Sequence, residues 1–353
     1  MTKMLNFTVG PVMTWDEILN IGGEQVPYFR TQEFSEIMLE NERLMCKFTF
    51  APEGSRTVFL TGSGTMAMEA SIINFLSEND RVIVINGGSF GHRFAEMCTI
   101  HNVPFDEIKL KCGESLREEQ LSEYDGKGYT ALLVNIHETS TGVLYDMPMI
   151  GEFCKRNGLF LIADGISSFL ADNLDVEALG IDVLITSSQK ALACAPGISM
   201  LTFNRKALDR VKNKKTLVSY FDVKLALTNG ERGQTPFTPA VSILLQINAR
   251  LKMIGRNGGV EKEIERVASL AAYFREKIRC APYEMIPSTP SNAITAVHPL
   301  NESAYDIFMR LKDERNIWIC PSGGDMKDYM FRVGHLGNIS YDNIDELIDV
   351  LAI

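Results

Sequence analysis

The sequence predicts an α/β protein built around a buried, mostly parallel sheet. Between Arg56 and Phe203, short β-branched and apolar runs alternate with stretches of helical length. The runs are apolar on both faces, which is typical of strands that helices cover on both sides. The chain has 353 residues, of which 45% are hydrophobic and 23% charged, so it is able to bury a large core. This alternation of strands and helices favours the α/β class.

The predicted strands of this sheet follow one another in chain order. They are Thr57–Leu60, Val82–Ile85, Ala131–Val134, Leu159–Ala163, Val183–Thr186 and Ile198–Leu201. After Pro239 the pattern changes to two long helical stretches, Val241–Ile254 and Val260–Arg279, with the Gly255–Gly259 stretch between them. We therefore expect a domain boundary in this part of the chain.

The C-terminal part predicts a small α+β unit. Its expected elements are a strand at Ala293–Val297, a helix at Ala304–Glu314, a strand at Tyr329–Val333 and a helix at Asp342–Leu351. At roughly 100–200 residues per domain, the chain length predicts two domains or one large domain with a smaller one.

Charge and cysteine content exclude several classes of protein. The chain has 35 Lys and Arg against 45 Asp and Glu, and its formal charge of −10 argues against a nucleic-acid binder. No apolar run approaches the roughly 18 residues of a membrane span, and Met1–Gly10 lacks the apolar stretch of a signal peptide. The seven cysteines never form a C-x-x-C pair, so we expect no disulfide framework and no metal site. These features predict a cytoplasmic protein with reduced thiols.

A glycine-rich string, Gly62–Ala67, follows a predicted strand and opens the helical run Ala67–Leu76. Backbone N–H groups at the start of a helix bind anions. The string also fits the dinucleotide pattern G-x-G-x-x-A, but Ile85–Gly88 lacks the acidic residue that this pattern needs about 20 positions later. The hydroxyls of Ser63 and Thr65 favour one phosphate monoester instead. The alternative is a glycine-rich turn without a ligand.

Asp164 and Lys190 each follow a buried apolar run, where open α/β sheets bind their ligands. Asp164 comes directly after Leu159–Ala163, although an aspartate there is also a common N-cap or turn former. Lys190 lies among small residues in Ser187–Ala193. A lysine that is partly removed from water has a lowered pKa and reacts with carbonyls. The alternative for Lys190 is a surface lysine at a strand end.

The chain carries the three groups that pyridoxal phosphate requires of its protein. They are a phosphate loop, the Asp164 carboxylate and a lysine 26 residues later. This cofactor needs an anchor for its phosphate, a carboxylate to keep its ring nitrogen protonated and an amine for its aldehyde. Phe90, which follows the second strand, is a candidate to stack on the ring. Thr139 is a candidate to hydrogen-bond the phenolic oxygen. The combination predicts pyridoxal phosphate as the cofactor.

The order of these strings resembles the class V, fold-type I pyridoxal-phosphate aminotransferases. Within them it is most similar to the branch of alanine–glyoxylate (serine–pyruvate) and 2-aminoethylphosphonate–pyruvate aminotransferases. The resemblance covers most of the chain and includes Phe7–Pro11, Phe29–Phe34, the phosphate loop, His137–Gly142, Asp164, Lys190 and Phe331–Gly334. It implies a large domain at residues 15–250 with a mostly parallel seven-stranded sheet covered by helices. It also implies a small α+β domain at residues 1–14 and 251–353.

The resemblance implies which residues bind the cofactor. Its phosphate would be held by the glycine-rich loop and by the residue before the lysine: Ser63, Gly64, Thr65 and Gln189. Phe90 would stack on one face of the ring and Ile166 would pack against the other. Thr139 would reach the phenolic oxygen.

The resemblance also implies the catalytic and substrate-binding residues. Asp164 would pair with the ring nitrogen, and Lys190 would form the Schiff base and carry protons. Arg332 would bind the substrate carboxylate or phosphonate, since a guanidinium presents a fork that fits either anion. The alternative for Arg332 is an ion pair on a strand of the small domain. Thr235 and Thr238 would cross to the partner's phosphate in a homodimer with shared sites, although relatives often have Tyr in place of Thr235.

The implied reaction is a ping-pong transfer of an amino group between a small-molecule amino donor and a 2-oxo acid. The string Gln189–Leu192 favours alanine or serine as donor and glyoxylate or pyruvate as acceptor. The string Ser63–Thr65 favours the alternative, a 2-aminoethylphosphonate–pyruvate aminotransferase. The sequence leaves the identity of both substrates open.

Two further alternatives stay open from the sequence. A cysteine desulfurase or lyase of the same fold would need a mobile cysteine, and Cys320 lies in a stretch with loop character. However, desulfurases tend to have histidines where this chain has Phe90 and Gln189. A cofactor-free binding protein on the same fold is disfavoured because Asp164 and Lys190 both stand in their motifs. His137 and His335 either line the site or are structural.

Overall fold

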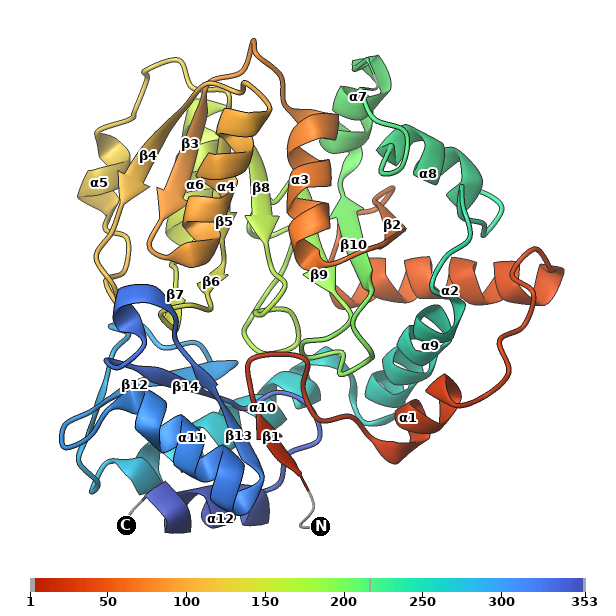
Figure 1. The fold of residues 1–353 in the computed structure, drawn as a ribbon. Helices are drawn as coiled ribbons and strands as arrows, with labels where there is room; N and C mark the ends of the chain where they lie inside the picture. The colour runs from red at the N-terminus through yellow and green to blue at the C-terminus, as the bar shows by residue number, and fades with distance from the viewer. Residues whose placement is uncertain (1–3, 216, 352–353) are drawn as a thin grey trace.

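The computed structural model describes residues 4–215 and 217–351 as an α/β protein with one large and one small sheet (Figure 1). The predicted domain ranges also include residues 1–3, 216 and 352–353, which lie outside the described residues. In Figure 1 the elements of the small sheet lie together below the large sheet, close to both chain ends.

The large sheet has seven strands in the order β2-β10-β9-β8-β5-β3-β4. The strands are β2 (Arg56–Thr61), β3 (Val82–Asn86), β4 (Phe105–Lys109), β5 (Ala131–Asn135), β8 (Phe160–Asp164), β9 (Val183–Ser187) and β10 (Ile198–Phe203). Only β10 runs against its neighbours, pairing antiparallel with both β2 and β9. The mostly parallel sheet and its six predicted strands are confirmed, while β4 was not predicted.

Helices cover both faces of this sheet because successive side chains of each strand point to opposite sides. In β3, Val82 and Val84 belong to one core and Ile83 and Ile85 to the other. The first core is completed by α3 (Gly64–Phe75), α4 (Ser89–Ile100), α7 (Arg205–Asn213) and α8 (Val223–Gly230). The second is completed by α1 (Asp16–Gly22), α2 (Gln32–Phe48), α5 (Glu118–Ser122), α6 (Met147–Asn157) and α9 (Val241–Arg256).

Local sequence signals set several helix ends. The Thr31 hydroxyl accepts a hydrogen bond from the backbone N–H of Phe34 at the start of α2. The Asp146 carboxylate does the same for Met149 in α6, which ends at Gly158 in the left-handed conformation. A side-chain oxygen before a helix satisfies a backbone donor that has no partner within the helix, and glycine adopts the left-handed conformation without strain.

The small sheet has five strands in the order β1-β13-β14-β12-β11 and its own core. The strands are β1 (Leu5–Phe7), β11 (Tyr283–Met285), β12 (Ile294–Pro299), β13 (Ile317–Pro321) and β14 (Phe331–Gly334). The helices are α10 (Gly259–Ile278), α11 (Ala304–Arg315) and α12 (Tyr341–Leu351), with a 3₁₀ turn at Gly324–Met326. The strand β1 joins this sheet by parallel pairing with β13, with Leu5 opposite Ile317.

The predicted division of the chain at residue 250 falls inside helix α9, and it stays a prediction. The predicted break between two long helices is confirmed, since α9 ends at Arg256 and α10 begins at Gly259. The last predicted strand is shifted, because β14 begins at Phe331 rather than at Tyr329. A short two-stranded hairpin, β6 (His137–Glu138) with β7 (Val143–Leu144), follows β5.

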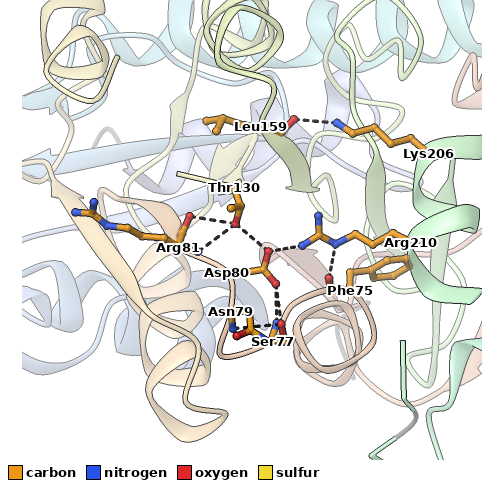
Figure 2. A network of polar contacts seen from close by, with 9 residues as sticks. All are labelled: Phe75, Ser77, Asn79, Asp80, Arg81, Thr130, Leu159, Lys206 and Arg210. Atoms are coloured by element: carbon orange, nitrogen blue, oxygen red, sulfur yellow. Dashed lines mark hydrogen bonds and ion pairs between the residues drawn. The ribbon is translucent and has the colours of Figure 1, made fainter. Parts of the chain in front are cut away.

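A polar network ties together the starts of three strands of the large sheet (Figure 2). Asp80, just before β3, accepts hydrogen bonds from Thr130, just before β5, and from Arg210 of α7. Burial by itself raises the pKa of Asp80, but these hydrogen bonds and the Arg210 charge outweigh it and hold the pKa below its ordinary value. Lys206 of α7 donates to the carbonyl of Leu159, just before β8, at 3.0 Å. This network fixes the edge of the sheet opposite to the strand ends that carry the predicted site.

Within residues 4–215 and 217–351, no helix combines the length and the apolar character that crossing a bilayer requires.

Candidate active site

The parallel strands of the large sheet end at one edge, and the residues predicted from the sequence lie in the segments that end or follow them. β2 precedes the loop of Ser63, Gly64 and Thr65; β3 precedes Phe90; β5 and β6 precede Thr139; β8 ends at Asp164; and β9 precedes Gln189 and Lys190. This edge is where open α/β sheets bind their ligands. The fold therefore brings together residues that are far apart in the sequence.

Lys190 is buried, with 9% of its surface exposed. Its Nζ donates a 2.6 Å hydrogen bond to the carbonyl of Val9, in the segment that follows β1. Burial lowers the pKa of Lys190 to about 8. Gly10 lies against the lysine stem, where an added Cβ would meet Lys190 Cδ at 2.8 Å. The N-terminal segment thus covers an amine that is far more basic in water than in this site.

Asp164 is the buried carboxylate at the end of β8. Its Oδ2 accepts from Asn135 Nδ2 at 2.6 Å, and its Oδ1 accepts from the backbone N–H of Ile166 at 2.8 Å. Burial raises the pKa of Asp164 to about 6, although both hydrogen bonds and the charge of Lys190 lower it. A buried carboxylate of this kind fits a protonated ring nitrogen, because a positive partner would offset the loss of hydration.

The glycine-rich loop opens helix α3 with donors that remain available for a ligand. Ser63 is the N-cap residue, yet its side chain caps no backbone N–H. A Cβ at Gly64 would lie 2.3 Å from Ile166 Cδ1, so only glycine allows this close approach of loop and Ile166. The Thr65 hydroxyl accepts from Arg93 Nη1 at 3.1 Å. A helix start with free hydroxyls and a nearby guanidinium fits a phosphate group.

The backbone of Phe90, in helix α4, is held by a carboxylate from strand β6. Glu138, fully buried in β6, accepts from the backbone N–H groups of Phe90 at 3.4 Å and Gly91 at 2.9 Å. It also accepts from the backbone N–H of Ser140 at 3.1 Å and from its hydroxyl at 2.5 Å. A carboxylate at the first turn of α4 satisfies donors that have no partner within the helix and interacts favourably with the helix dipole. These hydrogen bonds fix the backbone of Phe90, from which its ring extends.

Arg332, from strand β14 of the small sheet, reaches the loops of the large sheet. Its Nη1 donates to the carbonyl of Thr139 at 3.2 Å and its Nη2 to the carbonyl of Pro321 at 2.8 Å, while Nε is buried without a partner among the described residues. A cavity of about 620 Å³ lies between the two sheets. Its lining includes Phe90, Leu110, Ser140, Thr141, Met330 and Arg332. The cavity thus combines an aromatic ring, apolar side chains and a guanidinium.

Thr235 and Thr238 lie apart from this cavity in the single chain. They line a small depression beside the end of β2, together with Tyr220. The Thr235 hydroxyl donates to the carbonyl of Phe237 at 2.8 Å, and its own carbonyl accepts from Arg30 at 2.8 Å. Neither residue lines the 620 Å³ cavity, although Thr61, which lines the same depression, directly precedes the phosphate loop.

Cys320 lies in strand β13, so the predicted loop character of this stretch was wrong. It is the residue opposite Arg332 in the small sheet. Pro321 and the glycines after it favoured a loop, but the strand ends only where they begin, because Ile317 and Ile319 are needed in the core of the small sheet.

Sequence reasoning missed four residues that support the site: Asn135, Glu138, Ser167 and Arg93. Asn135 binds Asp164 at the end of β8, and Glu138 binds the backbone of Phe90 and Gly91 in helix α4. Ser167 contacts Thr139, with 2.7 Å between the two hydroxyl oxygens, and Arg93 contacts Thr65. Asn135 carried a usable signal, since it is a polar residue at the end of an apolar strand, and Glu138 follows it by three residues in the short strand β6. Nothing in the local sequence distinguishes Ser167 or Arg93.

The sequence profile of the family described as aminotransferase class-V matches residues 26–325. A Synechococcus protein named as the small subunit of a soluble hydrogenase is 30% identical over 356 residues, which cover 99% of this chain and 92% of that protein. An uncharacterized aminotransferase of Methanocaldococcus jannaschii is 30% identical over 344 residues, with coverage of 95% and 88%. The alanine–glyoxylate aminotransferase of Rattus norvegicus is 28% identical over 361 residues, with coverage of 99% and 87%.

The fold is also similar to that of solved structures. The aspartate aminotransferase of Thermus thermophilus superposes with a TM-score of 0.91 at 27% identity, and the match covers 98% of this chain and 97% of that one.

Proposed function

Because the chain belongs to the class V aminotransferases, we propose that it moves an amino group from alanine or serine to glyoxylate or pyruvate. Membership of this family confirms three predictions from the sequence: the fold-type I architecture, the transaminase class and pyridoxal phosphate as cofactor. The identity of the substrates and the roles of the individual residues are the proposal.

The observation that carries the proposal is the meeting of Lys190, Asp164 and Arg332. They come from the loop after β9, the end of β8 and strand β14, respectively. Arg332 reaches the large sheet by donating to the carbonyl of Thr139, and the pKa of Lys190 is raised by the charge of Asp164 and lowered by that of Arg332. An amine, a carboxylate and a guanidinium in one buried region are the groups that aldehyde chemistry, ring protonation and anion binding need.

Lys190 is proposed as the nucleophile and proton carrier. Bound pyridoxal phosphate supplies an aldehyde that exchanges amines and a ring that takes up electrons. With a pKa of about 8, roughly a tenth of the Lys190 amine is neutral at pH 7, and only the neutral amine is nucleophilic. The same amine would take a proton from the substrate Cα and return it.

Asp164 is proposed to hold the ring nitrogen in its protonated form, since its buried carboxylate gains a positive partner there. Phe90 and Ile166 would fix the plane of the ring from its two faces. The hydroxyls of Ser63 and Thr65, with the N–H groups of α3, would bind the phosphate. Orienting the reacting groups in this way lowers the entropic part of the barrier.

Arg332 is proposed to bind the substrate carboxylate in the cavity. A guanidinium makes two parallel charge-assisted hydrogen bonds with a carboxylate. The apolar side chains of Leu110 and Met330 in the lining suit a small donor such as alanine. The similarity to the alanine–glyoxylate aminotransferase of Rattus norvegicus supports the same choice.

A 2-aminoethylphosphonate–pyruvate aminotransferase is the second candidate. The string Ser63–Thr65 favours it, and the cavity wall carries Lys109 in addition to Arg332. A doubly charged phosphonate would be favoured by this additional positive charge.

The remaining alternatives have less support. A desulfurase needs a mobile cysteine, whereas Cys320 is fixed in strand β13. A cofactor-free binding protein disagrees with the family to which the chain belongs.

The protein is further proposed to act as a homodimer with two shared sites. Thr235 and Thr238 lie away from the cavity of their own chain, as residues that serve a partner's site would. We also propose a cytoplasmic location, in line with seven cysteines that form no disulfide.

The test is an absorbance spectrum of the purified protein, repeated after adding L-alanine, L-serine, L-aspartate or 2-aminoethylphosphonate. We expect a visible band of bound cofactor that alanine or serine shifts to shorter wavelength. A shift only with 2-aminoethylphosphonate would select the second candidate. A band that persists unchanged in Lys190→Ala would refute the role of Lys190.

A further inference from the structure

Thr139 is connected to two buried side chains that the proposed reaction does not use. The Thr139 hydroxyl oxygen lies 2.7 Å from Ser167 Oγ, and Ser167 Oγ lies 2.9 Å from His137 Nδ1. All three residues are at most 4% exposed. They form a chain of hydrogen bonds that starts at His137 and ends at the residue proposed to face the phenolic oxygen of the cofactor.

The chain of hydrogen bonds has two possible directions. A hydroxyl has one hydrogen to donate, while a neutral histidine carries its hydrogen on only one of two ring nitrogens. If His137 Nδ1 carries it, Nδ1–H donates to Ser167, Ser167 donates to Thr139, and the Thr139 hydrogen is left for the cofactor. If Nε2 carries it, every donor points the other way, and Thr139 presents only lone pairs.

His137 is neutral over the working pH range. Burial, together with the charges of Lys190, Arg275 and Arg332, lowers its pKa to about 3. These cations therefore disfavour the charged imidazolium, so His137 carries one ring hydrogen rather than two.

The other ring nitrogen decides between the two directions. His137 Nε2 is buried and has no hydrogen-bond partner among the described residues. A buried N–H without a partner is rarer in proteins than a buried acceptor without one. The hydrogen is therefore favoured on Nδ1, which has a partner, and Nε2 is left as a bare acceptor.

We propose that His137 and Ser167 are positioning residues that orient the Thr139 hydroxyl so that it donates its hydrogen to the phenolic oxygen of the cofactor. This inference rests on the proposed function, in which Thr139 faces that oxygen. A hydrogen bond to the charged form of an oxygen stabilises that form. Ser167 and His137 would thus lower the pH at which the bound cofactor loses its titratable proton.

One competing contact exists within the chain. Ser167 Oγ also lies 3.5 Å from the carbonyl oxygen of His137. This distance is at the outer limit of a hydrogen bond, whereas the 2.7 Å contact with Thr139 is ideal for two hydroxyls. The shorter contact therefore takes the Ser167 hydrogen.

The first test reads the position of the hydrogen without any cofactor. Nitrogen-15 NMR of the histidine side chains distinguishes the two neutral forms, and the chain has only five histidines. Loss of one signal set in His137→Asn assigns it. We expect the hydrogen on Nδ1 at pH 7, and a hydrogen on Nε2 would overturn the proposal.

The second test is a pH titration of the visible absorbance of the cofactor-loaded protein. Thr139→Val should raise the midpoint by about 1 pH unit, the size expected for a lost hydrogen bond to a charged oxygen. Ser167→Ala should raise it by at least half as much, and the double variant no further than Thr139→Val. Ser168→Ala is the matched control, because Ser168 is equally buried but its hydroxyl has no partner among the described residues.

The His137 variants complete the test. His137→Asn keeps an N–H near the place of Nδ1 and should leave the midpoint close to wild type, whereas His137→Leu should raise it like Ser167→Ala. A shift in Thr139→Val without one in Ser167→Ala would refute the positioning role and leave the proposed function intact. No shift in Thr139→Val would remove Thr139 from the cofactor contacts, and the inference would fail with it.

Discussion

Lys190 lowers the stability of the protein at the position proposed for its chemistry. Burial brings its pKa from the ordinary 10.5 to about 8. Since one pKa unit corresponds to 1.36 kcal/mol, the buried ammonium costs about 3 kcal/mol. The folded-state pKa is the lower one, so this cost is present in full below pH 8 and disappears as the pH rises through 10.5.

Replacing Lys190 by methionine should therefore stabilise the protein. For Lys190→Met without cofactor we expect a free energy of unfolding about 2–3 kcal/mol higher at pH 7, a smaller gain near pH 10, and loss of amine transfer. Urea denaturation at both pH values measures this. Lys155→Met, at an exposed position of α6, should change stability at neither pH. An unstabilised Lys190→Met would mean that the amine is better solvated than the structure indicates.

Arg332 makes a separate prediction about substrate binding. Arg332→Gln should lower kcat/KM for the amino donor about 10- to 100-fold, because an amide cannot form charge-assisted bonds to the carboxylate. The absorbance of the bound cofactor should stay unchanged. Steady-state kinetics measures the effect, with Arg310→Gln as control, since Arg310 of α11 pairs with Glu302 at the surface. Equal kinetics in both variants would place the substrate anion elsewhere.

Among the elements, the N-terminus of helix α4 is held by a residue of strand β6. Its first N–H groups donate to Glu138 of β6, so α4, Phe90 and the hairpin of β6 and β7 are fixed as one unit. Gly88, just before the helix, is needed for the same reason, because a Cβ there would lie 2.7 Å from Glu138 Cδ.

Removing the charge of Glu138 should loosen this unit. For Glu138→Gln we expect a loss of about 1–2 kcal/mol in the free energy of unfolding, the size of a lost cap and its interaction with the helix dipole. The circular dichroism of the bound cofactor should change as well, because the Phe90 ring is no longer held. Glu152→Gln, at an exposed position of α6, is the control and should affect neither signal. A change in stability with unchanged cofactor dichroism would show that Phe90 is held by other contacts.

The network at the opposite edge of the sheet should affect stability alone (Figure 2). Arg210→Met leaves the buried Asp80 carboxylate without its ion pair, so we expect a loss of about 1–3 kcal/mol at pH 7 and an unchanged cofactor spectrum. The folded-state pKa of Asp80 is lowered, so its contribution is present above the ordinary pKa of 3.8 and is lost as the pH falls through the folded value. Denaturation curves at pH 7 and at a pH below 3.8 should show a smaller difference at the lower pH.

The elements that the sequence predicted best are those with a uniform environment. The six predicted strands of the large sheet are apolar on both faces because helices cover both. β4 was missed because it is the edge strand, where Asp106, Glu107 and Lys109 replace the apolar pattern. β13 was missed because it is short and ends in Pro321, which hides the pairing of its start with β1.

From the sequence, the candidate site was predictable only for residues that directly follow a recognisable apolar strand. Asp164 and Lys190 each follow an apolar run, and parallel strands bring such ends together. Asn135, the partner of Asp164, is visible only as a polar residue at the end of an apolar strand. Val9, the partner of Lys190, stayed hidden, because a hydrogen bond between distant segments leaves no mark in either local sequence. The same holds for the chain from His137 to Thr139.

If the homodimer shares its active sites, two different impaired variants should regain activity when they form a mixed dimer. Lys190→Ala and Thr238→Ala should each be inactive or impaired alone, but in the mixed dimer one site combines an intact Lys190 with the partner's intact Thr238. After mixed refolding, about a quarter of the wild-type activity should return, because half of the dimers are mixed and each has one intact site. Activity no higher than the average of the two variants would indicate self-contained sites. Sedimentation of each variant checks that dimers form.

The pairing of β1 with β13 has a consequence for how the protein is made. On the ribosome, the first strand leaves the exit tunnel long before its partner, with Leu5 waiting for Ile317. At about 5–20 residues per second, translation keeps them apart for about 15–60 s. The Val9 carbonyl therefore cannot be pinned over Lys190 until the chain is nearly complete. Throughout synthesis the nascent large sheet is without this cover, and the amine stays within reach of small molecules.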